Sequence, residues 1–201
     1  MRFFAIAVLS ALCGLCALHV TEAVAAQSDT TRMALPAPEK TGGKPLMEAL
    51  AARSSHRGFA ETALSEQVLA NLLWATWGVN RADGLRTAPT TKNTQAIQVY
   101  AALENGVWLY DGVKNELVLA MEGDTRSTFG GAPLTLLFAV PEKDAAGGMH
   151  VGSLYQNAGL FCASEGLANV VKTTGAKALD GKLPLPEGYK VLVVQSVGYP
   201  R

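Results

Sequence analysis

Apolar residues recur at helical spacing in three stretches, residues 46–53, 66–77 and 150–165. Pro45 suits the first turn of the first stretch because its fixed φ matches a helix. The second stretch lies between Ser65, which can cap the N-terminus, and Gly78, which can end the helix. Its apolar side chains cover more than one face, so we expect it to be buried on most sides. The third stretch ends at Gly166.

Strand-like patterns occupy four longer stretches, residues 97–103, 107–110, 134–140 and 189–197. Asn105 and Gly106 lie between the first two and are a typical hairpin turn pair. The third stretch is a continuous apolar run between Pro133 and Pro141, which favours a central strand. Strands and helices therefore interleave on both sides of a hairpin, and the pattern predicts an α+β layered domain.

Shorter or irregular segments fill the remaining positions. We expect a short element at residues 117–121, an extended piece that begins at Val170, and a small helix within residues 174–181. Residues 79–95 have little periodicity and many turn-forming residues. Loops of this length inside a compact domain usually carry function, so this segment is a candidate binding loop.

The first 26 residues have the pattern of an export signal. Arg2 supplies the positive charge, residues 3–18 are almost wholly apolar, and residues 23–26 offer the small side chains that signal cleavage needs. The apolar run is too short to favour a permanent membrane span. We therefore expect cleavage near Ala26, a periplasmic or secreted protein, and no membrane attachment after cleavage.

Residues 27–44 are polar, contain prolines and glycines, and lack periodicity, so they are expected to form a flexible arm. Residues 45–201 are long enough for one domain with its own core. The 17 basic and 17 acidic residues balance, which argues against nucleic acid or an anionic membrane as a partner. Cys162 would be the one cysteine left after cleavage, and its apolar surroundings predict a buried, inert thiol.

Side-chain catalysis and metal binding find little support in the sequence. His56 and His150 are far apart and have no cysteine or carboxylate at ligand spacing. The chain contains no nucleophile elbow and no phosphate loop that ends in Gly-Lys-Ser/Thr. We therefore predict no catalytic side chain and no metal site. Two function classes are left: a binding module, and an enzyme whose cofactor performs the difficult step.

Basic and hydroxyl side chains occur together at the end of the first predicted helix. Arg53 and Arg57 are four residues apart, with Ser54 and Ser55 between them. Guanidinium groups stay charged at physiological pH and donate in a planar fork, so these residues suit a phosphate group. The alternative is that they end a helix and lie in water.

The chain resembles the nitroreductase superfamily of flavin mononucleotide (FMN) enzymes, and most of all its short SagB-type branch. Three motifs carry the resemblance: Arg53-x-Ser55-x-Arg57-x-Phe59, Pro89-Thr90-Thr91-x-Asn93-x-Gln95, and the helix and turn over residues 156–167. The resemblance covers residues 45–200. It implies a central, mostly antiparallel sheet flanked by helices, in a dimer.

The resemblance also implies a site for FMN. The first motif would grip the phosphate, the second would lie along the ring of the neighbouring subunit's flavin, and the backbone near residues 171–173 would pass close to the ring. The implied cofactor residues are Arg53, Ser54, Ser55, Arg57, Pro89, Thr90, Thr91, Asn93, Gln95, Val171, Lys172, Thr173 and Arg201.

Three positions depart from the family pattern. Ser54 occupies a place that is often basic, which would weaken the grip on FMN. Lys172 replaces a small or apolar residue, and it would either compensate near the ring or be a surface lysine. Arg201 would replace a phosphate ligand, or the clamp would rest on the first motif alone.

The implied function is an exported FMN-dependent oxidoreductase that works as a homodimer. Electrons would pass through flavin N5 by a ping-pong scheme, from a small-molecule donor to a small-molecule acceptor. Two alternatives remain at this point. One is a non-catalytic periplasmic protein that binds flavin or another ligand on the same fold, and the other is a structural export protein without flavin.

Overall fold

The computed structural model describes residues 31–201, so the predicted signal sequence and the first residues of the predicted arm lie outside the described residues. Within this part the helices are α1 (Leu46–Ala52), α2 (Glu66–Trp77) and α3 (Gly147–Glu165), with 3-10 turns η1 (Thr91–Asn93) and η2 (Arg126–Phe129). The strands are β1 (Arg32–Ala34), β2 (Gln98–Leu103), β3 (Gly106–Asp111), β4 (Glu116–Glu122), β5 (Leu134–Pro141), β6 (Ala168–Lys172) and β7 (Tyr189–Gly198).

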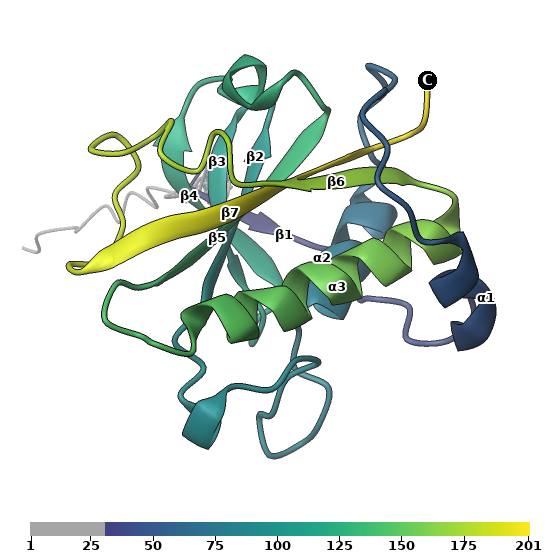
Figure 1. Ribbon diagram of the computed structural model, residues 1–201, viewed down its shortest axis with the longest axis horizontal. Coiled ribbons are helices and arrows are strands. Elements are labelled where there is room, and N and C mark those ends of the chain that lie inside the picture. The colour runs from purple at the N-terminus through teal and green to yellow at the C-terminus, as the bar shows by residue number, and fades with distance from the viewer. Residues whose placement is uncertain (1–30) are drawn as a thin grey trace, which may run out of the picture.

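The seven described strands form one sheet in the order β1-β4-β3-β2-β5-β7-β6, and every pair in it is antiparallel. Helices α2 and α3 pack on one face (Figure 1). The other face is covered by η2 and by the turns between β6 and β7, which contribute Phe129, Leu179 and Leu183 to a second core. The predicted α+β fold with an antiparallel sheet is confirmed, and β5 lies near its centre as expected.

Helix α2 has the predicted bounds and the predicted caps. The Ser65 hydroxyl accepts a hydrogen bond from the Val68 N–H at 3.3 Å, and the Gly78 N–H donates to the Trp74 carbonyl at 2.8 Å. These contacts satisfy backbone groups that a helix end leaves open. The buried residues of the helix include Leu69, Leu72, Leu73 and Trp77. The helix is therefore the apolar support on which α3 rests.

Helix α3 begins three residues before the predicted start. The Asp144 carboxylate accepts a hydrogen bond from the Ala146 N–H at 2.9 Å and fixes the turn that leads into the helix. Gly147 then packs against Val140, with which a Cβ at this position would be in contact at 3.4 Å. The helix ends at Gly166, whose φ of +72° is the left-handed conformation expected of that glycine.

The hairpin between β2 and β3 is confirmed, with its turn shifted by one residue. Leu103 pairs with Gly106, so the two loop residues are Glu104 and Asn105. Gly106 opens β3 with a φ of +148° and a Cβ there would lie 2.7 Å from the Met121 carbonyl oxygen. Glycine is required at the strand position because of this close approach, rather than in the turn itself.

The prediction of a flexible arm is wrong for the described part of residues 27–44. Residues 32–34 form β1, which pairs with β4 and places Arg32 in an ion pair with Glu116. Further along, the Glu39 N–H donates to the Asn71 side chain at 2.8 Å and the Lys44 N–H donates to Ser164 at 2.7 Å. A three-residue edge strand has almost no periodic pattern, so it could not be predicted from the sequence.

The small helix predicted within residues 174–181 is also absent, and this segment consists of turns. Gly175 and Gly181 have positive φ values of 92° and 70°, which interrupt any helix. Leu179 and Leu183 are nevertheless buried against the sheet. The apolar residues of this segment serve to cover the second face of the sheet.

Candidate functional site

The 53–59 segment runs from the end of α1 to the last residues of the chain. Its backbone is held by the His56 N–H, which donates to the Asn169 carbonyl at 2.8 Å, and by the Arg201 N–H, which donates to Gly58 at 3.4 Å. Phe59 also forms an isolated bridge with Pro200. The C-terminus therefore lies beside this segment (Figure 1), and the structure brings Arg201 to the first predicted motif.

The arginines of this region have no acidic partner. Arg53, Arg57 and Arg201 are exposed, and across residues 31–201 none of them forms an ion pair with a carboxylate. The aliphatic stem of Arg53 lies over Gly159 of α3, where an added Cβ would be 3.8 Å from the Arg53 Cγ and Cδ. Ser55 is also exposed. The region is therefore a set of free cationic and hydroxyl donors, which suits an anion.

Ser54 differs from this set because its hydroxyl makes contacts within the segment. Its hydroxyl lies 2.8 Å from the Nε2 atom of His56, and a weaker contact joins it to the Ala52 carbonyl at 3.4 Å. The side chain is exposed but engaged within the segment. Of the predicted first motif, Arg53, Ser55 and Arg57 are thus the residues with open donors.

Strand β6 is the last strand of the sheet, so one of its edges is open. The Asn169 carbonyl faces that edge because it accepts the His56 N–H rather than a bond from β7. Backbone groups alternate along a strand, so the N–H and carbonyl of Val171 face the same open edge. Thr173 follows the strand and is exposed. The predicted backbone near residues 171–173 is therefore available for polar contacts.

Lys172 has a partner within the chain. Its ammonium donates a hydrogen bond to the carbonyl oxygen of Phe129 in η2, and burial lowers the pKa of the Lys172 amine. The contact joins the open edge of the sheet to the η2 turn. The structure thus favours neither a free surface lysine nor a side chain directed at a cofactor ring.

Two buried amides lie beneath the same edge. The Gln195 NH2 group donates to the Asn169 Oδ1 at 3.0 Å and to the Tyr155 carbonyl at 3.2 Å. The Oε1 atom of Gln195 is buried and has no hydrogen-bond partner. Asn169 is also close to Gly159 and hence to Arg53. The buried side chains next to the arginines therefore include the polar amides of Asn169 and Gln195.

The 89–95 loop contains the second predicted motif, and most of its polar groups bond to one another. The Thr90 hydroxyl accepts a hydrogen bond from the Gln95 N–H at 3.0 Å. The Gln95 NH2 group donates to the Asn93 Oδ1 at 3.1 Å and to the Gly84 carbonyl at 3.2 Å. Pro89 is exposed, as is the Asn93 side chain. Asn93, rather than Gln95, is therefore the amide that keeps donors for a ligand.

Three residues of this loop have left-handed backbone conformations. Lys92, Asn93 and Gln95 have φ values of +53°, +53° and +46°. Such conformations cost free energy for residues with a side chain, and they persist only where the surroundings hold them. The loop therefore needs anchors outside itself.

Arg86 is one of these anchors, and its role could not be predicted from the sequence. Its Nε donates to the Gln95 Oε1 at 2.7 Å and its Nη1 donates to the Trp77 carbonyl at 2.7 Å. The guanidinium also lies over the Trp77 ring, 4.7 Å from the centroid, and burial lowers its pKa. Trp77, at the end of α2, and Gln95 are each nine residues away, and Arg86 lies in the irregular segment between them, where no periodic pattern predicts a contact.

His150 is the second anchor, although its place in the sequence predicts no functional contact. Its Nε2 lies 2.9 Å from both the backbone nitrogen and the hydroxyl of Thr91. Its Nδ1 lies 3.2 Å from the Asp144 carboxylate. Thr91 is 59 residues away in sequence, so only the folded chain shows this contact. Asp144 lies six residues before His150 in the sequence, but this spacing matches no metal-ligand pattern.

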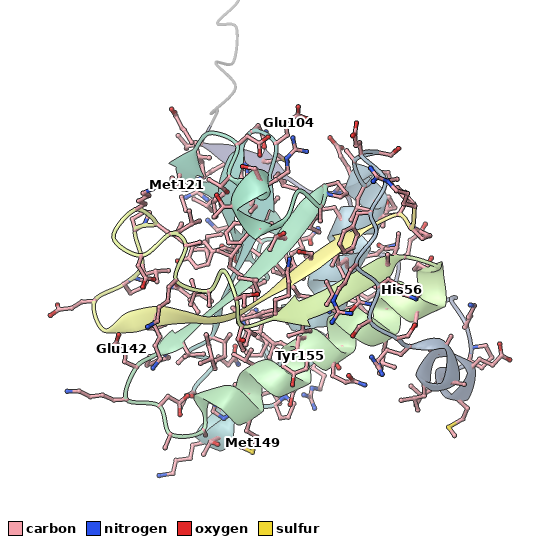
Figure 2. The ribbon with its side chains drawn as sticks, turned by 45° about the horizontal axis from the view of Figure 1, so that its top comes forward. His56, Glu104, Met121, Glu142, Met149 and Tyr155 are labelled. Atoms are coloured by element: carbon pink, nitrogen blue, oxygen red, sulfur yellow. The ribbon has the colours of Figure 1, made fainter. Side chains whose placement is uncertain are left out.

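The two predicted motifs lie at opposite ends of α3. Arg53 packs over Gly159, whereas Thr91 contacts His150 at the start of the helix. These helix positions are about 14 Å apart along the axis, given a rise of about 1.5 Å per residue. Figure 1 shows the same separation, and Figure 2 places His56 and Met149 at the two ends of the helix. One chain thus does not bring its two motifs together.

Other chemistry is scarce across residues 31–201. No cluster of three or more histidine, cysteine or acidic side chains there could hold a metal ion. Cys162 is buried in α3 as predicted, and burial raises the pKa of its thiol to about 12, which keeps it protonated at neutral pH. None of the helices in this part is long and apolar enough to cross a membrane.

A mainly apolar pocket of about 330 Å³ lies away from both motifs. It opens between the start of α2, the β2–β3 turn and η2, and includes Leu64, Leu103 and Arg126. It shares no residue with the predicted site. Arg126 is already paired with Asp124 at 2.8 Å and lies 3.7 Å from Glu104.

The model of the nitroreductase family matches residues 50–199. A putative nitroreductase from Ralstonia eutropha is 34% identical, with a TM-score of 0.79 over 85% of this chain and 90% of that one. No curated protein sequence matches significantly.

Two more distant structures share the fold. A nitroreductase from Bacteroides fragilis with bound FMN is 17% identical, with a TM-score of 0.58 over 79% of this chain and 89% of that one. A chain of the Escherichia coli microcin synthetase McbBCD complex is 17% identical, with a TM-score of 0.61 over 96% of this chain and 85% of that one. The family match, which spans most of the chain, and the relative that is 34% identical decide the family. This chain belongs to the nitroreductase family.

Proposed function

We propose that this chain is an exported FMN-dependent oxidoreductase that acts as a homodimer on small-molecule electron donors and acceptors. The observation that carries the proposal is the group of three arginines, Arg53, Arg57 and Arg201, which are exposed and unpaired within residues 31–201. They come from the two ends of the domain, and the backbone hydrogen bond from Arg201 to Gly58 places Arg201 beside the 53–59 segment. The B. fragilis relative, which shares the fold, binds FMN.

The donor set fits the phosphate of FMN. Guanidinium groups bind phosphate oxygens in bidentate fashion, and a serine hydroxyl such as that of Ser55 adds a further donor. Uncompensated positive charges at one surface repel each other, so an anion between them stabilises the arrangement. A bound phosphate would therefore neutralise these charges and stabilise the surface.

The polar groups next to the arginines fit the rest of the cofactor. The open edge at Val171 offers one backbone donor and one acceptor, the combination that the polar edge of a flavin ring requires. The buried acceptor on Gln195 and the amide of Asn169 add polar character beneath the ring or its sugar-like chain. These residues would orient the cofactor by hydrogen bonds and exclude water from one side of it.

When bound, FMN supplies the redox chemistry, taking electrons from a donor and passing them to an acceptor in two separate half-reactions. The chain's own residues position the cofactor. The phosphate would be held by Arg53, Ser55, Arg57 and Arg201. The 89–95 loop of a second copy would lie along the ring, with its Asn93 amide as the donor.

The separation of the two motifs supports the proposal of a homodimer. A second copy arranged about a two-fold axis can bring its 89–95 loop to the arginines of the first copy, as the family resemblance implies. Helix α1 leaves Leu46, Met47 and Leu50 exposed at 64%, 75% and 44%. Apolar side chains gathered on one short helix favour burial against a partner.

Export and the SagB-type branch complete the proposal. Export rests on the signal-like pattern of residues 1–26, which lie outside the described residues. The branch rests on the motif resemblance. An exported location favours a donor other than a nicotinamide cofactor, or a reaction in which the chain oxidises its substrate.

An absorbance spectrum of the purified chain, before and after dialysis against FMN, tests the proposal. We expect a yellow protein with the absorbance bands of oxidised flavin. The enzyme is then distinguished from a binding protein by adding a quinone or a nitro compound to the reduced protein, which should reoxidise it faster than oxygen alone does. A folded, dimeric protein that stays colourless with FMN would contradict the proposal.

A further inference from the structure

His150 is a buried imidazole that the proposed function does not yet use. It lies in the first turn of α3, is 3% exposed, and has both ring nitrogens in contact with polar groups. Its Nε2 is 2.9 Å from the Thr91 backbone nitrogen. Thr91 belongs to the 89–95 loop, so the ring joins that loop to the helix.

The contact with Thr91 decides which ring nitrogen carries the proton. A backbone N–H can only donate, so Nε2 must accept and must be unprotonated. The proton is then on Nδ1, which donates to the Asp144 carboxylate at 3.2 Å. Asp144 is itself held by the Ala146 N–H, at 2.9 Å. The turn before α3 thus fixes both the ring and its tautomer.

The loop that this ring holds is strained. Lys92, Asn93 and Gln95 all have positive φ, and such conformations persist only where the surroundings hold them. Arg86 holds the far end of the loop through Gln95, whereas His150 holds the near end through Thr91. We expect loss of either anchor to let the loop relax and to move Asn93, the amide with free donors.

We propose that His150 is a positioning residue that keeps the 89–95 loop in its cofactor-contacting form for as long as its Nε2 is unprotonated. The inference rests on the proposed function, since the loop contacts a flavin only if the chain binds FMN. A second proton on the ring turns Nε2 into a donor that faces the Thr91 N–H. The hydroxyl of Thr91 can rotate to accept, but the backbone N–H cannot, so that hydrogen bond is lost.

The charged groups around the ring are few. Asp144, from the turn before α3, faces Nδ1, and it is the ionisable side chain that contacts the ring within residues 31–201. Lys92 follows Thr91 and Lys143 precedes Asp144, and both lysines are exposed.

The first experiment compares FMN affinity in the full chain between pH 8 and pH 5 for the natural protein, His150→Gln and His56→Gln. A glutamine at position 150 can accept the Thr91 N–H but does not titrate in this range. The phosphate of FMN does titrate there, so the variants are compared at each pH. We expect His150→Gln to match the natural protein within about threefold at pH 8, because it keeps the hydrogen bond.

At pH 5 the natural protein and His56→Gln should bind FMN about tenfold more weakly than His150→Gln, the usual effect of one lost hydrogen bond. Parallel loss of affinity in all three proteins would overturn the inference. A His150→Ala variant, which lacks the acceptor, should bind weakly at both pH values. Equal binding by this variant and the natural protein at pH 8 would also overturn it.

The second experiment needs no flavin. Hydrogen exchange of the peptide that covers residues 89–95, corrected for the intrinsic effect of pH on exchange, measures how firmly the loop is held. Protection should fall on acidification in the natural protein and stay constant in His150→Gln. Absence of this difference contradicts the inference even if FMN binds. Its presence in a chain that does not bind FMN would contradict the proposed function and leave the anchoring by His150 in place.

Discussion

The 53–59 segment and the 89–95 loop use their polar side chains in opposite ways. In the segment, Arg53 and Arg57 are exposed and unpaired, and the chain is held in place by backbone hydrogen bonds. In the loop, Gln95 and Thr91 are bonded to residues of the same chain, and the backbone is strained. The segment therefore has donors to offer a ligand, whereas most of the loop maintains its own shape.

This difference separates two effects that a mutation can have. A change in the segment removes ligand contacts and leaves the folded chain intact. A change in the loop or its anchors removes contacts on which the folded chain itself depends. The first kind should affect cofactor affinity alone, and the second should affect stability and affinity together.

Removal of both segment arginines should have the largest effect on binding. Each guanidinium can contribute about 1.5–3 kcal/mol through charge-assisted hydrogen bonds, so Arg53→Ala/Arg57→Ala should weaken FMN binding by more than about 100-fold. The free energy of unfolding without FMN should change by less than about 0.5 kcal/mol, since both side chains are exposed. Flavin fluorescence titration and urea unfolding measure the two quantities.

The double variant Lys177→Ala/Lys190→Ala is the matched control for charge, because it removes two exposed lysines elsewhere. It should bind FMN normally. If both double variants weakened FMN binding equally, the arginines would act through net charge alone and the clamp would be wrong.

The elements with strong local signals could be predicted from the sequence. Helix α2 has the expected bounds because Ser65 and Gly78 provide local caps. Strand β5 was evident because it is buried on both faces and therefore continuously apolar. The segment that would hold the phosphate could also be proposed, because guanidinium and hydroxyl groups in one short stretch have a chemistry that does not depend on distant residues.

The elements that depend on distant partners could not be predicted from the sequence. Strand β1 exists because β4 offers an open edge and an ion pair to Arg32. The second motif predicts that Gln95 contacts the ring. In the structure its amide oxygen instead accepts a hydrogen bond from Arg86, and its amide nitrogen donates one to the Gly84 carbonyl. The anchor at His150 depends on a contact over 59 residues. Such contacts are set by tertiary packing, and a single sequence gives little sign of them.

Substitution of Arg86 should have the second-largest effect and should move both quantities. Arg86→Ala leaves the Gln95 Oε1 and the Trp77 carbonyl without their donor and removes the contact with the Trp77 ring. We expect the free energy of unfolding to fall by about 2–4 kcal/mol and FMN affinity to fall by about tenfold. Urea unfolding and fluorescence titration of the same sample measure the pair.

Arg86→Lys keeps the charge but cannot make both hydrogen bonds, so it should fall between the natural protein and the alanine variant. Arg81→Ala is the neighbouring control, since Arg81 is exposed and makes a single long contact of 3.4 Å. An Arg86→Ala variant that lost affinity without losing stability would remove the distinction between the segment and the loop.

The smallest expected effect comes from relieving strain in the loop without touching its contacts. Lys92 is exposed, makes no hydrogen bond through its side chain within residues 31–201, and has a φ of +53°. Asparagine tolerates the left-handed conformation better than lysine does. Lys92→Asn should therefore raise the free energy of unfolding by a few tenths to about 1 kcal/mol. FMN affinity should change by less than about twofold.

The control is Lys177→Asn, in which the same substitution is made at an exposed lysine whose φ is not positive. It should bring no gain in the urea unfolding experiment. If both variants were equally stable, the left-handed backbone at position 92 would carry no strain. The loop would then need no anchors, and the effects expected at Arg86 and His150 would have to come from their local contacts alone. A higher free energy of unfolding for Lys92→Asn alone would show that the loop is held in an unfavourable backbone conformation. Hydrogen bonds among its own polar groups would then be needed to keep that conformation.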